Sequence, residues 1–165
     1  MQQRSFRSHD GTQITWYETG LTDGPTLILA NGLGGNIATW RHVINRFEKD
    51  FRIICWDYRG LFNSGKAPTS AAYSVSHHSR DLKALLDHAG VLDPTLMGWS
   101  MGVQVNFEFC RQNPGVTRGI VALNGVPGNP LHTAFHSDVL HRRQEEIFGF
   151  IRRHMHRAWK LRRLY

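Results

Sequence analysis

The feature that most constrains this chain is a serine between two glycines, at the point where an apolar run passes into a helical pattern. The five residues are Gly98-Trp99-Ser100-Met101-Gly102. Apolar residues lead into them from position 95, and residues 103–112 have a helical pattern that Asn113-Pro114 ends. A serine between a strand end and a helix start, with glycine two residues to either side, is typical of the turn called a nucleophile elbow.

Such a turn has consequences for the chemistry of its serine. The elbow serine has a strained backbone, and a side chain at Gly98 or Gly102 is expected to collide with the neighbouring strand or helix. The turn also directs the Met101 amide to the N-terminus of the new helix, where unpaired N–H groups favour developing negative charge. The five residues therefore predict a nucleophile and one half of an oxyanion hole.

A second glycine cluster, Asn31-Gly32-Leu33-Gly34-Gly35, follows the short apolar run at residues 26–30. It does not match the dinucleotide-binding pattern, because Ile37 stands where the third glycine would be, and the chain has no P-loop sequence. A simple turn is one interpretation. The other is the second half of an oxyanion hole, where the backbone must come close to a substrate.

The rest of the chain alternates short apolar strands with amphipathic helices. Strands are expected at residues 4–7, 13–18, 26–30, 51–56, 95–97 and 118–123, and the Asp10-Gly11 step joins the first two as a hairpin. Helices are expected at residues 39–49, 76–88 and 103–112. This alternation predicts an α/β fold with a mostly parallel sheet and flanking helices.

Composition limits the class of protein. A chain of 165 residues with 41% hydrophobic and 20% charged residues is typical of a globular protein, most simply a single folding domain. Residues 1–10 have no apolar signal segment, and no run reaches the ~18 apolar residues of a membrane span. Cys55 and Cys110 lack the spacing of a disulfide framework, and two such thiols predict a reducing, cytoplasmic location.

The net charge of +7 is concentrated at one end of the chain. Residues 141–165 hold eight Lys or Arg against two Glu, which leaves the remaining residues nearly neutral. Apolar residues recur there at helical spacing from Leu140 to Trp159, which predicts one or two amphipathic helices with solvated cations. A membrane surface or nucleic acid is a weaker interpretation, because no groove-reading motif accompanies the charge.

Other polar residues invite a functional interpretation that the sequence disfavours. His77-His78 and the pair His132 and His136 have no third ligand at a recognisable interval, so no metal site is expected. Asp57 and Arg59 both precede the candidate nucleophile in the chain, which is not the order of the known triads. We expect these two side chains to fix a loop by hydrogen bonds and charge.

Taken together, three motifs resemble the α/β-hydrolase superfamily, in its branch of esterases, lactonases, haloperoxidases and C–C bond hydrolases. They are residues 31–35, Asp57-Tyr58-Arg59-Gly60 continuing to Ser64-Gly65, and residues 98–102. The resemblance covers residues 1–128, the N-terminal part of the hydrolase core, and residues 129–165 look like the start of a helical cap. It implies that Ser100 is the nucleophile, that the amides of Leu33 and Met101 form the oxyanion hole, and that no cofactor is needed. The supporting glycines would be Gly32, Gly34, Gly98 and Gly102.

The chain also departs from the family pattern. Asn31 replaces a more usual histidine, which affects the hydrogen bonds that support the glycine loop. Serine at the elbow argues against the dehalogenase and epoxide hydrolase members, which use aspartate there. The acid and histidine that follow the nucleophile in this family are expected to be absent, because the two later strands are missing and Asn124-Gly125 offers no carboxylate.

Local substitutes for that acid and base are disfavoured. Asp138 with His141, His154 or His156 keeps the order of the family's triad, but their spacing places all of them on the same cap helices. The expected function is therefore a serine hydrolase of carboxylic esters, lactones or related small acyl substrates, inactive as a 165-residue chain. The alternatives are a non-catalytic binding module on the same scaffold, or an incomplete gene. Self-association is expected through an exposed sheet edge and the cap helices.

Overall fold

The computed structural model describes residues 1–128 together with Arg142, Arg143, Glu146 and Gly149. Residues Met1–Val126 form one compact unit, and all the strands and helices given below lie within it. The cap helices predicted for residues 129–165 fall outside the described residues, apart from those four positions. The same is true of the histidines at 132, 136, 141, 154 and 156 and of Asp138. The division at residue 128 stays a prediction.

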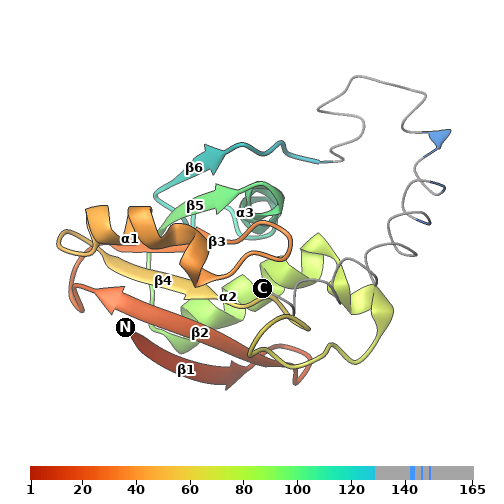
Figure 1. The fold of residues 1–165 in the computed structure, drawn as a ribbon, viewed down its shortest axis with the longest axis horizontal. Coiled ribbons are helices and arrows are strands. Elements are labelled where there is room, and N and C mark those ends of the chain that lie inside the picture. Colours follow the sequence, from red (N-terminus) through yellow and green to blue (C-terminus); the bar gives the residue numbers. More distant parts are fainter. Residues whose placement is uncertain (129–141, 144–145, 147–148, 150–165) are drawn as a thin grey trace, which may run out of the picture. The chain divides into compact units, whose positions relative to one another are not determined.

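The described residues form a six-stranded mixed sheet (Figure 1). In chain order the strands are β1 Gln2–Arg7, β2 Gln13–Gly20, β3 Thr26–Ala30, β4 Arg52–Trp56, β5 Thr95–Trp99 and β6 Gly119–Leu123. Their order across the sheet is β1-β2-β4-β3-β5-β6. The β1–β2 hairpin is antiparallel and joins β4 antiparallel, whereas β3, β4, β5 and β6 run parallel to one another. The predicted α/β fold with a mostly parallel sheet is confirmed.

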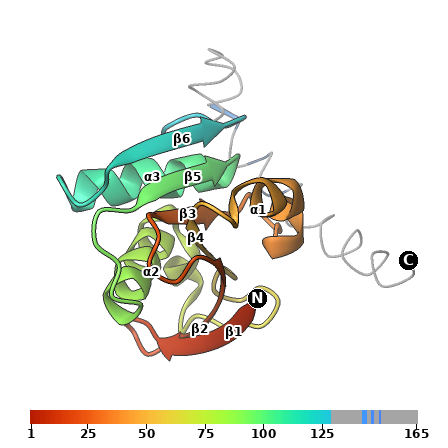
Figure 2. The same cartoon turned by 90° about the vertical axis from the view of Figure 1, so that its left-hand side faces the viewer.

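The helices cover both faces of the sheet. They are α1 Arg41–Phe47, α2 Val75–His88 and α3 Met101–Gln112, with short 3-10 helices η1 Ile37–Trp40 and η2 Ser70–Tyr73. Figure 2 shows α1 on one side of the parallel strands and α2 and α3 on the other. The core is divided accordingly, because Leu27 and Leu29 pack with the α1 side and Ile28 with the α2 and α3 side. Successive side chains of a strand point to opposite faces, so an unbroken apolar run is what a doubly covered strand requires.

The parallel arrangement gathers the functional motifs at one edge of the sheet. Strands β3, β4, β5 and β6 all end at the same edge, and the chain segments that follow them begin at Asn31, Asp57, Ser100 and Asn124. Three of these four segments contain the motifs predicted from the sequence. Their meeting at the carboxyl ends of the strands is the usual place for a site in an open α/β sheet.

Asp57 and Arg59 both hold loops in place, each with partners of its own. The Tyr17 hydroxyl and the Asn63 amide donate to Asp57 at 2.7 and 3.1 Å. The Arg59 guanidinium makes paired hydrogen bonds to Asp81 on α2, and it also bonds Asp10 in the β1–β2 turn. Arg59 therefore connects the loop after β4 to a helix and to the hairpin. Asp57 and Arg59 thus hold loops by hydrogen bonds and charge, with different partners.

Strand β6 is an edge of the described sheet. Its neighbour among the described strands is β5, and its sequence Gly-Ile-Val-Ala-Leu contains no charge or proline. Val121 on this strand is 37% exposed. An uncharged edge strand is a template for pairing with another strand, so self-association through β6 stays a prediction.

His78 on α2 gives the fold a dependence on pH. Its ring is 4% exposed and packs 4.4 Å from the Tyr58 ring. Burial lowers the pKa of His78 to about 4, although the charge of Asp81 opposes this shift. An unfolded histidine has a pKa near 6.5. Between that pH and about pH 4, His78 is therefore protonated in the unfolded chain but stays neutral in the folded chain. The stabilisation that His78 gives is therefore complete above about pH 6.5 and is lost as the pH falls toward 4.

We expect the free energy of unfolding to fall by about 3 kcal/mol between pH 6.5 and pH 4 on account of this one group. Urea unfolding followed by circular dichroism at several pH values measures it. The variant His78→Gln should have a flatter pH dependence over this range, whatever its stability at pH 7. His42→Gln, at an exposed position of α1, is the control. A His78→Gln curve parallel to that of the parent chain would contradict the prediction.

Candidate active site

Ser100 lies in the turn between β5 and α3, and its backbone is strained. Its φ is 53° and its ψ is −117°, a combination that residues with a side chain rarely adopt. The Ser100 amide donates to the carbonyl of Leu123 at 3.0 Å, so the end of β6 holds the turn. The residue remains partly exposed. A strained conformation fixed by neighbouring strands is how a side chain is presented above a sheet.

The glycines on either side of Ser100 are required by close contacts. A Cβ atom at Gly102 would lie 2.0 Å from the carbonyl oxygen of Ala30, at the end of β3. A Cβ atom at Gly98 would lie 2.6 Å from the carbonyl carbon of Gly102. These contacts are with backbone atoms, which cannot rotate away as a side chain can. The first turn of α3 thus packs directly on the neighbouring strand.

The glycine loop after β3 lies against the elbow. A Cβ atom at Gly32 would be 2.6 Å from the Trp99 ring and 3.3 Å from the Ser100 Cβ. The loop then makes a tight turn in which the Gly35 amide donates to the Gly32 carbonyl at 3.0 Å. Gly34 has a φ of 73° in this turn and nothing within 4 Å of its Cβ position. Gly34 is therefore required for its backbone conformation and Gly32 for its close approach.

Two backbone amides near Ser100 have no partner in the described part of the chain. They belong to Leu33 in the glycine turn and to Met101, the first residue of α3. Leu33 is 67% exposed, so this turn lies at the surface. The N-terminus of α3 adds the favourable end of a helix dipole beside Met101. Unpaired amides of this kind can donate hydrogen bonds to negative charge that develops on a substrate oxygen.

Asn31 links the glycine loop to the core through both its side chain and its backbone. Its side-chain amide donates to the Trp56 carbonyl at 2.8 Å, and its side-chain oxygen accepts from the Trp40 indole at 2.7 Å. Its backbone carbonyl accepts from the Tyr58 hydroxyl at 2.7 Å. Sequence reasoning noted Asn31 as a departure from histidine that affects the hydrogen bonds supporting the loop, but it did not identify their partners. It gave no role to Trp40 or Tyr58, whose positions carry no motif signal for this contact.

The described residues bring no acid or base to Ser100. No histidine or carboxylate among them is hydrogen-bonded to the Ser100 hydroxyl, and they contain no group of three residues suited to a metal ion. Asn124, at the end of β6, has a φ of 46°, and a Cβ atom at Gly125 would lie 2.5 Å from the Ser100 carbonyl oxygen. The segment after β6 therefore packs on the elbow through its backbone at Gly125.

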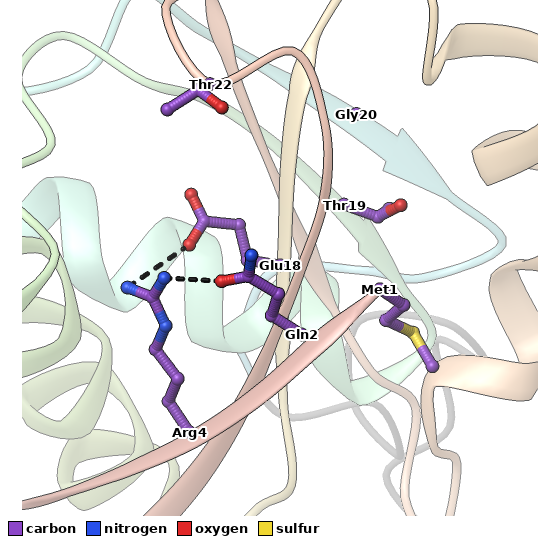
Figure 3. Close-up of a pocket in the computed structure, with 7 residues that line it drawn as sticks. All are labelled: Met1, Gln2, Arg4, Glu18, Thr19, Gly20 and Thr22. Atoms are coloured by element: carbon purple, nitrogen blue, oxygen red, sulfur yellow. Dashed lines mark hydrogen bonds and ion pairs between the residues drawn. The ribbon is translucent and has the colours of Figure 1, made fainter.

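A pocket of about 280 Å³ lies elsewhere in the described structure (Figure 3). It is lined by Met1, Gln2, Arg4, Glu18, Thr19, Gly20 and Thr22. Gly20 pairs with Arg52 at the start of β4, so this pocket lies at the amino ends of the parallel strands. Arg4 bonds Gln2 and lies 3.6 Å from Glu18, which neutralises its charge. The pocket is at the opposite edge from Ser100 and forms no part of the candidate site.

Comparison with known proteins decides the family. A family model described as the alpha/beta hydrolase fold matches residues 25–154. The chain belongs to this family. The match begins just before β3 and includes the glycine loop, the loop after β4 and the elbow, so it contains the three motifs of the candidate site.

Individual relatives of the chain within this family have different names. The protein called "Putative carbamate hydrolase RutD" from Stutzerimonas stutzeri is 30% identical over 112 residues, covering 68% of this chain and 42% of that protein. "Probable oxidoreductase EphD" from Mycobacterium tuberculosis is 28% identical over 126 residues, covering 76% of this chain and 21% of that protein. The chain thus spans less than half the length of these relatives.

Among solved structures, the epoxide hydrolase VrEH1 from Vigna radiata superposes with a TM-score of 0.70 at 25% identity. The superposition covers 81% of this chain and 41% of that one. An alpha/beta hydrolase from Novosphingobium aromaticivorans superposes with a TM-score of 0.67 at 24% identity, a likeness of fold alone. Among the described residues, no helix has both the length and the apolar character to cross a bilayer.

Proposed function

We propose that the chain carries the nucleophile of a serine hydrolase that acts on a carboxylic ester, a lactone or a related acyl substrate. The observation that supports this most is the strained Ser100, with a φ of 53°, beside a glycine loop so near that a Cβ atom at Gly32 would lie 3.3 Å from the Ser100 Cβ. The Leu33 and Met101 amides form the oxyanion hole in this proposal. Gly32, Gly34, Gly98 and Gly102 allow the backbone to adopt the necessary shape.

The reaction follows from these assignments. The Ser100 Oγ attacks the acyl carbon, its proton passes to a base, and the carbonyl oxygen becomes an oxyanion held by the two amides. The alcohol leaves with a proton, and water then hydrolyses the acyl-enzyme and restores the serine. Removal of one donor from an oxyanion hole typically lowers kcat about 10²- to 10³-fold. The two amides therefore account for a large part of the rate in this proposal.

A serine nucleophile favours an acyl substrate over an epoxide, although epoxide hydrolases are among the structural neighbours. Attack of a hydroxyl oxygen on an epoxide carbon would give an ether, which has no acyl carbon for water to attack. Attack on an ester, lactone or carbamate gives an acyl-enzyme that water can resolve. The similarity to a protein named as a carbamate hydrolase, at 30% identity, supports the acyl class without selecting one member of it.

The proposal leaves the catalytic acid and histidine outside the described residues. Without an adjacent base the serine hydroxyl stays protonated near neutral pH, and loss of the base typically lowers the rate by several orders of magnitude. We therefore propose that the 165-residue chain alone is inactive or very slow. The absence of a base beside Ser100 among the described residues also supports the second candidate, a non-catalytic binding module.

The proposal also includes the cellular location and the partners of the protein. Both cysteines are free, and Cys55 is buried, which suits the reducing cytoplasm. The partner is a small acyl substrate, and the chemistry assigned to Ser100 needs no cofactor. We propose no nucleic-acid or membrane partner, and we propose self-association through β6, whose edge is open among the described strands.

Labelling with a fluorophosphonate tests the proposed function. We expect mass spectrometry to place the label on Ser100 and Ser100→Ala to abolish it. Ser70→Ala, which removes an exposed serine of η2, should leave labelling unchanged. The 165-residue chain should react slowly, and a longer chain that continues into further strands should react at least 10³-fold faster. A folded sample that resists the probe in both lengths would instead identify a binding module.

A further inference from the structure

The glycine turn that carries the Leu33 amide begins at Asn31, which is anchored to the core by hydrogen bonds of its side chain and its backbone. That residue ends the β3 side of the loop and is fully buried, and its side chain is fixed between the Trp40 indole and the Trp56 carbonyl. Beyond it the chain runs Gly32-Leu33-Gly34-Gly35, and three of these four residues are glycines. Glycine has the greatest backbone freedom of any residue. The turn therefore cannot fix its own orientation by side-chain packing.

The peptide between Asn31 and Gly32 is fixed from the other side by Tyr58. The Tyr58 hydroxyl donates to the Asn31 carbonyl at 2.7 Å across 27 residues of sequence. Because a peptide unit is planar, a hydrogen bond that orients the carbonyl also orients the Gly32 N–H on its far side. The φ and ψ angles of Gly32 alone then separate this fixed plane from the plane that contains the Leu33 amide.

Tyr58 is well built for this contact. The residue is 1% exposed, and its ring lies 5.4 Å from the Trp56 ring and 4.4 Å from the His78 ring. Burial raises the pKa of Tyr58 well above its usual value, so the hydroxyl keeps its proton and remains a donor at physiological pH. On the next residue, the Arg59 guanidinium bonds Asp81 and Asp10 and fixes the backbone from which the tyrosine extends.

We propose that Tyr58 is a positioning residue for the oxyanion hole: its buried hydroxyl holds the Asn31 carbonyl and thereby sets the direction of the Leu33 amide. The catalytic part of this inference rests on the proposed function. The positioning of the Leu33 amide by Tyr58 does not depend on that function. The same carbonyl oxygen would lie 2.9 Å from a Cβ atom at Gly102, so the peptide that Tyr58 fixes also borders the first turn of α3. The Tyr58 hydroxyl thus fixes the Asn31–Gly32 peptide, which borders both the turn that carries the Leu33 amide and the first turn of α3, which carries the Met101 amide.

Tyr58→Phe removes one oxygen atom and tests the proposal. Tyr17→Phe is the matched control, because it also deletes a hydrogen-bonded hydroxyl from a side chain that is only 7% exposed, and its partner is Asp57. NMR relaxation of backbone amides is the readout that does not depend on reactivity. In Tyr58→Phe we expect the order parameters of Leu33 and Gly34 to fall from about 0.85 to below about 0.6, with β5 and α3 unchanged.

The second readout is the rate of labelling by a fluorophosphonate. It is measured on whichever of the two proteins reacts with the probe, the 165-residue chain or the longer chain. Displacement of an oxyanion donor should slow labelling about 10- to 100-fold in Tyr58→Phe, and Tyr17→Phe should react at the parent rate. A tyrosine with a merely structural role would lower the urea midpoint without changing either readout in the folded protein. Sucrose, which favours the folded state, is added equally to all samples so that a destabilised variant can still be measured.

The outcomes separate this inference from the proposed function. Order parameters at Leu33 and Gly34 that equal those of the parent chain would overturn the positioning role, whatever the labelling rate. A parent protein that never reacts with the probe would remove the serine hydrolase function, and the NMR comparison would still decide whether Tyr58 orders the turn. Loss of order in both variants would show a general loosening of the core and would also overturn the specific role.

Discussion

Replacing Gly102 with alanine is expected to lower the free energy of unfolding by about 3 kcal/mol or more. The added methyl group would lie 2.0 Å from the Ala30 oxygen, 2.6 Å from the Ala30 carbonyl carbon and 2.9 Å from the Asn31 oxygen. All three atoms belong to the backbone at the end of β3 and the start of the glycine loop. The strand and the helix must therefore separate, and this displaces the elbow and the loop together.

Urea unfolding followed by circular dichroism measures the effect of Gly102→Ala. The control is Gly119→Ala on β6, where nothing lies within 4 Å of the Cβ position and no positive φ is required. That substitution should leave the stability unchanged within about 0.5 kcal/mol. If Gly102→Ala unfolds at the same urea concentration as the control, the close packing of α3 on β3 is wrong.

The second large effect is expected at Asp81, the buried carboxylate of α2. Both Asp81 and Arg59 have fully buried side chains, and they are joined by hydrogen bonds of 2.6 and 2.8 Å. The Ser8 hydroxyl also donates to Asp81. Asp81→Ala would leave the guanidinium with Asp10 as its remaining carboxylate partner, which is expected to cost about 3–5 kcal/mol of stability. The penalty arises more from a buried charge with only Asp10 left to balance it than from the two lost hydrogen bonds.

Two further variants test this explanation. Asp87→Ala lies on the same helix and removes an ion pair with Lys83 in which both side chains are substantially exposed, so it should cost less than about 1 kcal/mol. The double variant Arg59→Met with Asp81→Leu removes both charges and should be more stable than Asp81→Ala alone. Equal losses in the single variant at Asp81 and in the double variant would show that burial of the charge is not the cause.

Most of the described strands and helices can be predicted from the sequence, because each apolar run has the length and the boundaries of one element. The runs before Asn31, Asp57, Ser100 and Asn124 are β3, β4, β5 and β6. The helix predicted at residues 39–49 is shorter in the structure. It begins as η1, whose first turn is capped by the Asn36 side chain, and continues as α1 Arg41–Phe47. Local periodicity does not separate a 3-10 turn from the first turn of an α-helix.

The order of the strands was beyond the reach of sequence reasoning. The hairpin of β1 and β2 pairs with β4, which follows it by more than thirty residues and runs antiparallel to β2. No residue of β2 shows in the sequence which strand it will meet. That choice depends on how the hairpin and the crossover helices share the two faces of the sheet.

The candidate site divides in the same way. Ser100 and its flanking glycines form a local motif, because a tight turn between a strand and a helix limits which residues can stand there. The roles of Tyr58 and Trp40 are not local in this sense. The Trp40 indole donates to the side-chain oxygen of Asn31 and the Tyr58 hydroxyl donates to its backbone carbonyl, and the two side chains come from separate elements. Gly34 also shows the limit of the motif, because its positive φ and not close packing makes glycine necessary.

The sequence by itself determined the family, the α/β alternation and the position of the elbow, because these depend on short-range patterns of apolar residues and glycine. The tertiary structure alone decided which strand lies beside which, that Asp81 and not Asp57 pairs with Arg59, and that Tyr58 reaches the Asn31 carbonyl. The physical reason is that backbone conformation is set by neighbours in the chain. A buried hydrogen bond or ion pair is set by whichever groups the packed elements bring within about 3 Å of one another.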